Sequence, residues 1–560
     1  MGEYIFYATD SIPENKIPVR PFAEYSGEAG FGFFTGQWGI PELNSGFVPA
    51  PWFQGTISAE QDAYGCHISP EAAEGGRLPL SFRADLKAPG KYFLTVTLYS
   101  PEDQEEVLLF AGRRQLVFRG GLKGGEEWTG SFPIHVCDII PRGETVRHKV
   151  QSAAVTVIGS SVRLVSISLE PWKGRTLFIA GDSTVTDQST QYPYAPEASY
   201  SGWGQMLPAF LKGAAAVSNH AHSGLTTESF REEGHYEILT EAIGPGDICL
   251  FQFGHNDQKL KNLRPEGGYQ KNLVRYIDEI RKKGAFPLLV TPLARNSWRG
   301  NDGAYNDLLK EYAKEVQRIG EAMAVPVLDL HGKSMAFITE HGLEASKRWF
   351  YPSDYTHTND YGAWKMAGFL WEELLNSGLF SYTGEKPRSW EPPKDFKVFE
   401  HFQGRMQAAE PQKERAPETD RPEEVLTRAE ALDFIIRAVN YFPINVYNDF
   451  FSDVIGHEWY AGIIECAFQN GLIPEEMIQK GCFFPEQAVT LEEFLYMVMT
   501  GYKSRKSLDF QRDYTIKGTL PWTREAVTAA CALGAAEPEE RWRRTLTRGE
   551  AAAILYRFGI

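Results

Sequence analysis

The spacing of apolar and polar residues divides the chain into stretches with different periods. Up to about residue 172, apolar and polar residues alternate in short runs that Gly and Pro separate, most clearly over 91–98, 106–110 and 154–158. A period of two places every second side chain on one face of a strand. The first stretch therefore predicts a β-sandwich over residues 1–172.

The pattern changes at about residue 174. Short apolar runs at 177–180, 216–219, 247–253, 287–291 and 326–330 now alternate with segments of helical period near 268–283, 306–323 and 360–375. Strands that alternate with helices are typical of a parallel sheet covered by helices on both faces. We therefore expect a three-layer α/β domain over residues 174–380, with any ligand at the carboxyl ends of its strands.

Residues 381–424 contain few apolar positions and many Pro, Glu, Lys and Gln, which predicts a flexible linker. A repeat follows it, because the pattern at 426–430 returns at 489–493 and again at 546–550. In each copy a Thr stands three residues before a Glu, as in a capping box, and an apolar helix follows. The last stretch, 425–560, therefore predicts an all-α repeat module, which makes the chain multidomain.

Composition excludes several classes of function. The 560 residues carry a formal net charge of -16, which argues against a general affinity for nucleic acid or anionic membranes. The six cysteines are scattered, without a pair at metal-ligand or redox spacing. No stretch is apolar enough to span a bilayer, and the first residues lack an export signal, so we expect a cytoplasmic protein. The cell surface is the alternative if a signal peptide has been removed.

The candidate nucleophile is Ser183, in the Gly181-Asp182-Ser183 turn that follows the 177–180 strand. A serine at a strand end is exposed on a rigid scaffold, as nucleophilic attack requires. Turns are rich in these three residues for local reasons, however, so this turn alone is weak support for catalysis.

Ester hydrolysis by a serine also needs a base, a group that orients the base, and donors for the oxyanion. Asp354 and His357 stand three residues apart before the last helix, so Asp354 can orient the ring while its Nε2 reaches Ser183. Gly224 can bring its backbone N–H close to a substrate, and Asn256 has an amide donor. We predict these roles from the joint occurrence of the residues.

Each part also has a purely structural interpretation. An Asp three residues before a His at a helix start is commonly a cap, and Gly-His-Asn-Asp is commonly a tight turn. His220, His222 and His255 could suggest a metal, but no carboxylate is spaced to complete a site. We therefore expect neither a metal nor an organic cofactor.

These blocks resemble the SGNH hydrolases, and within them the rhamnogalacturonan acetylesterase family. Ser183, Gly224, Asn256 and His357 match the four residues that name the superfamily, and Asp354 matches the aspartate of its last block. Residues 202–204, Gly-Trp-Gly, also resemble a segment of that esterase family, whereas the chain has Leu-Thr at 225–226 where the family commonly has Arg-Ser.

The resemblance implies a flavodoxin-like fold and a serine esterase that removes acetyl groups from a plant cell-wall saccharide, above all rhamnogalacturonan fragments. It places the oxyanion against the Ser183 and Gly224 N–H groups and the Asn256 amide. Acetylxylan, acetylmannan or general short-chain esters are alternative substrates. A wall-binding protein with a vestigial esterase site is the alternative from another class.

Two groups of basic residues follow strands of the α/β domain. Lys259, Lys261 and Arg264 come after the Asn256 block, and Arg295 and Arg299 come after the 287–291 strand. Either they are ordinary solvated surface residues, or they contact the carboxylates of a galacturonate-containing chain.

The outer regions have resemblances of their own. The strand entry at 89–92 and the strand at 162–167 resemble the galactose-binding-like sandwich that precedes some pectin esterases, which either binds sugar or packs on the catalytic domain. The repeats resemble S-layer homology repeats, which bind cell-wall polysaccharide. Leu491 replaces the arginine of the polymer-binding motif in the middle copy, which favours packing or oligomerisation over wall anchoring.

Overall fold

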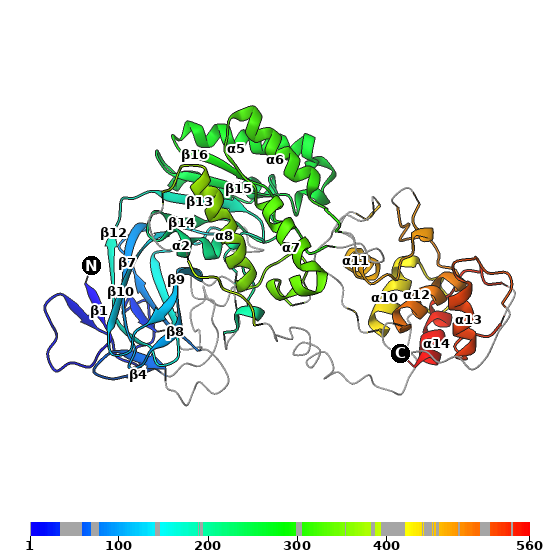
Figure 1. Ribbon diagram of the computed structural model, residues 1–560, viewed down its shortest axis with the longest axis horizontal. Coiled ribbons are helices and arrows are strands. Elements are labelled where there is room, and N and C mark those ends of the chain that lie inside the picture. Colours follow the sequence, from blue (N-terminus) through cyan, green and yellow to red (C-terminus); the bar gives the residue numbers. More distant parts are fainter. Residues whose placement is uncertain are drawn as a thin grey trace. The chain divides into compact units, whose positions relative to one another are not determined.

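The computed structural model divides the protein into two units, which are described separately (Figure 1). The first comprises Met1–Asn296 and Leu309–Phe402, and the second comprises Ser297–Leu308 and Gln403–Ile560. The described residues are 2–33, 59–68, 78–140, 146–188, 190, 194–297, 305–352, 354–381, 387–393, 421–439, 441, 451, 453–454, 459–479, 482–503, 516–538 and 541–559. Arg299 and residues 394–420 lie outside them.

The first unit begins with two sheets whose strands are mostly antiparallel. One has the order β10-β7-β12-β1-β2, with β5 and β4 added beside β12, and the other has the order β3-β6-β11-β8-β9. The strands are β1 (Glu3–Ile5), β2 (Lys16–Pro18), β3 (Phe31–Phe33), β4 (Ala59–Gln61), β5 (Cys66–Ile68), β6 (Pro79–Asp85), β7 (Gly90–Tyr99), β8 (Gln104–Ala111), β9 (Gln115–Leu122), β10 (Glu127–Val136), β11 (Ser152–Ile158) and β12 (Arg163–Pro171).

Both sheets contribute to one core, as the alternating sequence predicts. Leu94, Val96 and Leu98 of β7 are fully buried, while the residues between them are partly exposed. They share a hydrophobic cluster with Val107 and Leu109 of β8, in the other sheet. The strands predicted over 91–98, 106–110 and 154–158 are thereby confirmed as β7, β8 and β11.

The rest of the first unit is built on a parallel sheet of order β14-β13-β15-β16-β17. Its strands are β13 (Thr176–Gly181), β14 (Ala216–Asn219), β15 (Ile248–Gln252), β16 (Phe286–Val290) and β17 (Val327–Leu328). Its helices are α2 (Trp203–Leu211), α3 (Ser229–Glu232), α4 (His235–Ala242), α5 (Gln270–Lys282), α6 (Lys310–Met323), α7 (Leu330–Ser346) and α8 (Asp360–Asn376). The predicted parallel sheet is confirmed.

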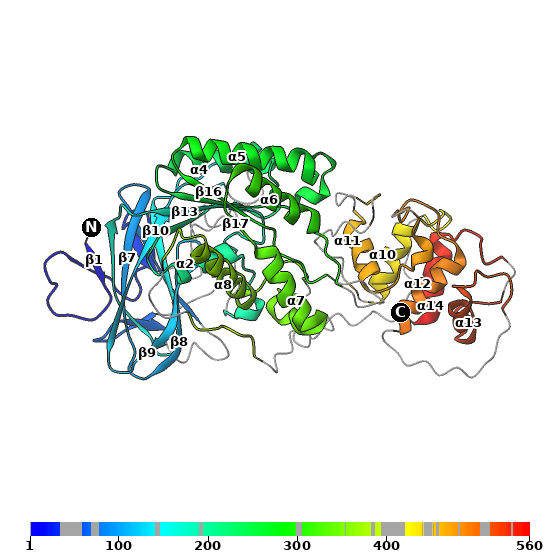
Figure 2. The same cartoon turned by 45° about the horizontal axis from the view of Figure 1, so that its top comes forward.

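Helices cover both faces of this sheet (Figure 2). On one face, α4, α5 and α6 share a core with the sheet residues Phe178 and Phe251. On the other face, α2 packs closely against α8. Because Gly181 at the end of β13 pairs with Gln252 at the end of β15, the loops that follow these two strands leave the sheet side by side.

Part of the expected linker packs on the first unit. Trp390 is buried, with its ring against those of Tyr361 and Trp364 in α8. The guanidinium of Arg119 from β9 lies 4.9 Å from the centre of the Trp390 ring. Residues 387–393 therefore join the sandwich to the last helix of the α/β domain.

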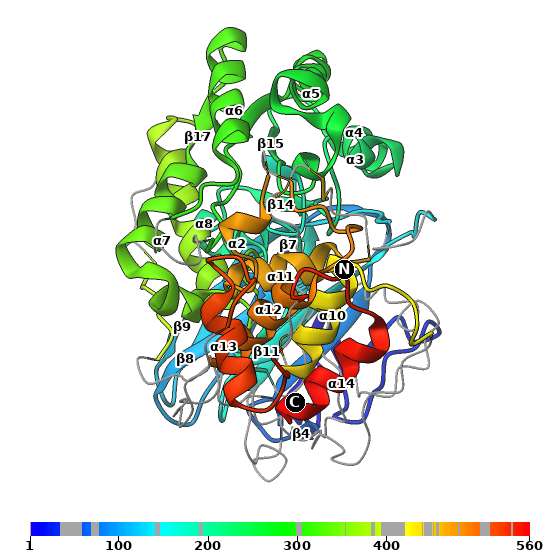
Figure 3. The ribbon, with the colours of Figure 1, turned by 90° about the vertical axis from the view of Figure 1, so that its right-hand side faces the viewer.

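The second unit is helical, with α10 (Arg428–Ala438), α11 (Ala461–Gln469), α12 (Leu491–Lys503), α13 (Arg524–Ala532) and α14 (Arg548–Phe558) around one hydrophobic core. Figure 3 looks onto this unit, with α10 in yellow and α14 in red. The predicted capping boxes are confirmed at Thr427 and Thr547. Thr490 makes the corresponding bonds to Glu493.

The three copies of the repeat meet through backbone hydrogen bonds that form a closed ring. The N–H of Leu426 donates to Leu546, that of Leu546 donates to Val489, and that of Val489 donates to Leu426, over 2.8, 3.1 and 3.0 Å. The residue before each capping threonine thus contacts both other copies.

Ion pairs reinforce the contacts between copies. Arg428 is buried and lies 2.6 Å from Glu493 of the next copy, and Arg548 pairs with Glu430 of the first copy. The middle copy has the buried Leu491 at this position. Because Leu491 cannot form an ion pair, Glu550 of the third copy, which corresponds to Glu430 and Glu493, is paired with Arg544 instead, at 2.8 Å.

None of the helices in the described part of the chain has both the length and the apolar character that crossing a membrane requires.

Candidate active site

Ser183 lies in a tight turn directly after β13. Gly181 ends the strand where β15 approaches closely: a Cβ atom there would lie 2.8 Å from the carbonyl oxygen of Gln252. The Asp182 carboxylate then accepts bonds from the backbone N–H and the hydroxyl of Thr184, over 3.0 and 2.7 Å. These contacts fix the turn around the serine, whose side chain lies at the carboxyl end of the sheet.

Asp354, His357 and Ser183 form a continuous hydrogen-bonded chain. His357 Nε2 lies 2.7 Å from Ser183 Oγ, and His357 Nδ1 lies 2.7 Å from Asp354 Oδ2. With Nδ1–H donating to the carboxylate, Nε2 is left to accept the serine proton. The structure thus brings together the three residues that the sequence assigned to catalysis, although 174 positions separate His357 from Ser183.

The carboxylate of Asp354 is held in its charged form. Its Oδ1 accepts the backbone N–H groups of Thr356 and His357, and its Oδ2 accepts the Tyr200 hydroxyl over 2.9 Å. Burial alone would raise the pKa of Asp354, but the charge of His357 and the hydrogen bonds outweigh it and lower the pKa to about 2. The ring of His357 therefore faces a permanent negative charge at neutral pH.

Neither Asp354 nor His357 caps α8. The N-cap is Asn359, whose side chain accepts the N–H of Gly362 over 3.0 Å. The structural interpretation of this Asp-His pair as a helix cap is therefore wrong.

The Gly224 and Asn256 loops contact each other beside the serine turn. Gly224 has φ of +87°, a left-handed conformation in which other residues are strained. The next residue, Leu225, accepts a 3.0 Å hydrogen bond from Asn256 Nδ2. An amide group carries two N–H bonds, so this contact fixes the amide while using one of them.

Lys259 is joined to the same amide. Its Nζ donates to Asn256 Oδ1 over 3.0 Å, which sets which end of the amide is the donor. This lysine is one of the five residues predicted to contact substrate, and the structure places it against a predicted oxyanion group.

The other predicted basic residues lie in different surroundings. Lys261 and Arg264 are exposed. Arg295 is buried, and its Nη2 donates to the carbonyl oxygen of His255 over 3.2 Å, so it is not part of an exposed basic loop. Arg299 lies outside the described residues.

Two of the three histidines considered as metal ligands, His255 and His220, bond to other groups. His255 lies between Asp182 and the carbonyl oxygen of Leu293, at 3.2 and 2.9 Å. His220 Nε2 lies 2.9 Å from the hydroxyl of Ser218. Within the described ranges, no three or more His, Cys, Asp or Glu side chains are arranged to hold a metal ion.

The Gly-Trp-Gly segment at 202–204, whose role the sequence does not reveal, packs against the serine turn. A Cβ atom on Gly202 would lie 2.3 Å from the backbone of Val185, so only glycine lets α2 begin against the serine turn. Trp203 then donates to Gln252 over 2.7 Å, and Gln252 donates to Thr184 over 2.7 Å. The Gly-Trp pattern was the available signal for this support beneath Ser183.

Comparison with known proteins agrees with this geometry. Residues 179–365 match the GDSL-like Lipase/Acylhydrolase family. The rhamnogalacturonan acetylesterase RhgT of Bacillus subtilis (strain 168) is 36% identical over 216 residues, which cover 36% of this chain and 90% of that protein. The chain belongs to this family of acylhydrolases.

Two further relatives match a similar share of the chain. The probable rhamnogalacturonan acetylesterase YesY of Bacillus subtilis (strain 168) is 35% identical over 211 residues, covering 36% of this chain and 94% of that protein. A rhamnogalacturonan acetylesterase of Emericella nidulans is 26% identical over 243 residues, covering 39% of this chain and 93% of that protein. The acylhydrolase described here is thus a carboxylic ester hydrolase.

Proposed function

We propose that the protein is a serine esterase that removes O-acetyl groups from plant cell-wall saccharides, with rhamnogalacturonan fragments as its substrate. The observation that carries the proposal is the hydrogen-bonded chain from Asp354 through His357 to Ser183. The names of the relatives RhgT and YesY support the choice of polysaccharide. No cofactor is part of the proposal.

In the proposed mechanism, Ser183 Oγ attacks the acetyl carbonyl while His357 Nε2 takes its proton. The backbone N–H groups of Ser183 and Gly224 and the Asn256 amide stabilise the oxyanion. His357 then gives the proton to the departing sugar oxygen, which leaves an acetyl group on Ser183. The imidazole next takes a proton from water, whose oxygen attacks the acetyl carbonyl. Collapse of this second intermediate releases acetate and returns the proton to Ser183.

The decisive experiment measures acetate released by the full chain from acetylated rhamnogalacturonan and, separately, from acetylated xylan, with p-nitrophenyl acetate as a small reference ester. We expect hydrolysis of the reference ester and a higher kcat/KM on the rhamnogalacturonan. A higher kcat/KM on xylan would overturn the substrate assignment and keep the esterase. No hydrolysis of any of the three would mean a vestigial site.

We further propose that Lys261 and Arg264 contact the carboxylates of a galacturonate-containing substrate. Both side chains are exposed and follow the Asn256 loop in sequence. Replacing both with Gln should raise KM on rhamnogalacturonan and leave p-nitrophenyl acetate hydrolysis unchanged. Equal effects on the two substrates would contradict selection by charge.

For the outer regions, we propose a galactose-binding-like sandwich over 1–172 that packs on the esterase domain of 174–380, and S-layer homology-like repeats over 425–560 that serve packing or oligomerisation. The support for the second role is that Arg428, from the motif expected to hold polymer, is buried in an ion pair with Glu493. Co-sedimentation of the full chain with purified cell-wall sacculi would contradict it. A cytoplasmic location fits the packing role.

A further inference from the structure

The turn between β8 and β9 of the sandwich has an unusual backbone. Ala111 and Gln115 pair across it, and Arg114 adopts φ of +62°. A long side chain is rare in this left-handed region and persists only where its surroundings hold it there. The hydrogen-bond acceptors of the Arg114 side chain all belong to the α/β domain, so the turn reaches from the sandwich into the domain that carries Ser183.

The guanidinium of Arg114 is completely buried, and all five of its N–H bonds have acceptors. Two from Nη1 go to the Oδ1 and Oδ2 of Asp360, over 3.0 and 2.8 Å. Nε donates to the carbonyl oxygen of Gln188 over 3.0 Å. Nη2 donates to the backbone carbonyl oxygen of Tyr200 and to the side-chain Oε1 of Gln205. A lysine could supply the charge but not this planar set of donors.

Two of these acceptors belong to the segments that carry the nucleophile and the base. Gln188 lies five residues after Ser183, and its Nε2 donates to the Ser183 carbonyl oxygen over 3.1 Å. Asp360 is the first residue of α8 and lies three residues after His357. One side chain from the sandwich therefore joins the serine loop to the histidine loop.

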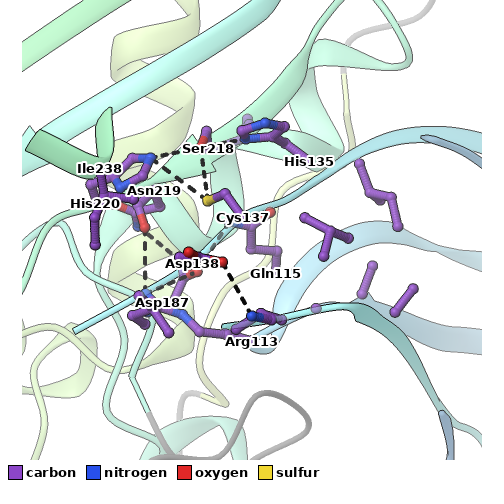
Figure 4. Close-up of a pocket in the computed structure, with 18 of the residues that line it drawn as sticks. Arg113, Gln115, His135, Cys137, Asp138, Asp187, Ser218, Asn219, His220 and Ile238 are labelled. Atoms are coloured by element: carbon purple, nitrogen blue, oxygen red, sulfur yellow. Dashed lines mark hydrogen bonds and ion pairs between the residues drawn. The ribbon is translucent and has the colours of Figure 1, made fainter. Parts of the chain in front are cut away.

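The neighbours of Arg114 in the turn hold the serine loop from the side. Gln115 donates to Asp187 over 3.0 Å, and Arg113 lies 3.6 Å from the same carboxylate. Asp187 also accepts from Asn219, at the end of β14, over 2.8 Å. Figure 4 shows these residues together at the wall of a cavity of about 70 Å³ between the sandwich and the parallel sheet.

We propose that the β8–β9 turn of the sandwich is part of the esterase active-site scaffold and that Arg114 is a positioning residue for catalysis. The inference rests on the proposed function, because the relative position of the two loops matters to turnover only if Ser183 and His357 react. Their 2.7 Å hydrogen bond joins loops that Arg114 holds together. A shift of about 1 Å between reacting groups can lower a rate about 100-fold.

The test compares Arg114→Lys with Arg119→Lys in the full chain. Arg119, on β9, pairs with Glu106 within the sandwich. It also donates to the carbonyl oxygen of Arg388, outside the sandwich. Its guanidinium lies over the ring of Trp364 in α8, but it bonds to neither Gln188 nor Asp360, so it is a control that reaches α8 without joining the serine and histidine loops. Turnover of p-nitrophenyl acetate is measured per active site, with the sites counted from the endpoint of serine labelling by an organophosphonate.

We expect Arg114→Lys to lower kcat per labelled site about 10- to 100-fold with KM changed less than about threefold, because orientation rather than binding is lost. Arg119→Lys should keep the wild-type kcat. A purely structural role would reduce the number of labelled sites or the melting temperature and leave kcat per site unchanged. That outcome, or equal losses in the two variants, would overturn the inference.

A second variant covers the case in which Arg114→Lys does not fold. Asp360→Asn keeps the size of the acceptor and removes its charge, so it should show the same loss of kcat with little change in KM. The double variant should lose no more than the worse single variant, because the two residues act through one contact. Wild-type kcat in folded Asp360→Asn, or additive losses, would contradict the proposal. An active wild type with these results would leave the proposed function standing, whereas an inactive wild type would end both.

Discussion

The start of α8 and the starts of the three repeat helices share one sequence pattern and differ in its use. Before α8, Asp354 and His357 stand three residues apart, and in the first repeat Thr427 and Glu430 have the same spacing. In the repeat, the two side chains bond to each other's backbone N–H groups and cap α10. At α8, by contrast, the imidazole points to Ser183.

The difference depends on which residue caps the helix. Asn359 caps α8, so the two polar residues before it are not needed for the helix end. In the repeats no such third residue intervenes, and the Thr-Glu pair satisfies the orphan N–H groups. A polar pair before a helix is therefore available for chemistry when another residue caps that helix.

The largest effect is expected on kcat, from variants of the residues before α8 and in the serine turn. Ser183→Ala and His357→Ala should each lower kcat by several orders of magnitude, because nucleophile and base act as a unit. Thermal unfolding of Ser183→Ala should stay close to wild type, whereas His357→Ala should also lose stability because it removes the partner of the buried Asp354 carboxylate. Turnover of p-nitrophenyl acetate near the wild-type rate in either variant would contradict a catalytic role.

Arg428→Ala in the repeats should lower stability and leave kcat unchanged. Removing one partner of a buried ion pair costs about 3–5 kcal/mol, and Arg428 also donates to the Phe483 carbonyl. Hydrogen exchange should accelerate in α10 and not in β13, and kcat should not change. Arg437→Ala, which removes an exposed pair with Asp433 on the same helix, is the control and should have little effect.

Acid should reveal the charged state of Asp354. Its pKa in the folded protein is about 2, below the ordinary 3.8, so the carboxylate contributes about 2 kcal/mol of stability at neutral pH. Because the folded pKa is depressed, this contribution is present above about pH 4 and is lost as the pH falls towards 2. The stability difference between wild type and Asp354→Asn should therefore shrink over that range.

Ser183→Ala is the control for this titration. It keeps the bonds of Asp354 to His357 and Thr356, so its acid unfolding should follow that of the wild type. A wild-type curve parallel to that of Asp354→Asn between pH 4 and 2 would show that the carboxylate is not held in its charged form.

The smallest effect is expected from a single cap. Thr547→Ala removes the side-chain acceptor at the start of α14 and should destabilise the second unit by about 1 kcal/mol, without a change in kcat. Thr528→Ala removes an exposed hydroxyl that bonds within α13 and should change stability much less. Calorimetry of the full chain measures both, and equal losses would mean that the cap has no special role.

The parts of the fold that were predictable are those with a local signal. Strand β7 shows its buried face by alternation, and α5 shows a helical period. Helix α2 was missed because nearly all its residues are buried and it contains Pro208, so no polar face marks it. Local pattern fails where an element is surrounded on all sides.

The residues of the site also divide into those that a local sequence signal marks and those that none marks. Ser183, Asn256 and His357 could be singled out as candidates because each stands in a short motif near an element boundary. Arg295 follows a strand and was expected in an exposed loop, but the structure buries it. Arg114 carried no signal at all, because its acceptor Asp360 lies 246 positions away in the chain. The importance of such a residue depends on a contact between domains.

The closed ring of hydrogen bonds among Leu426, Val489 and Leu546 fixes the number of repeats. In an open solenoid each copy contacts only its neighbours, so copies can be added or deleted at an end. Here the first and last copies bond directly, so the ring has no end at which a fourth copy could stack. Deleting any one copy would break two of the ring's three backbone bonds. A change in the number of copies, by deletion or by duplication, would therefore require the whole unit to be rebuilt.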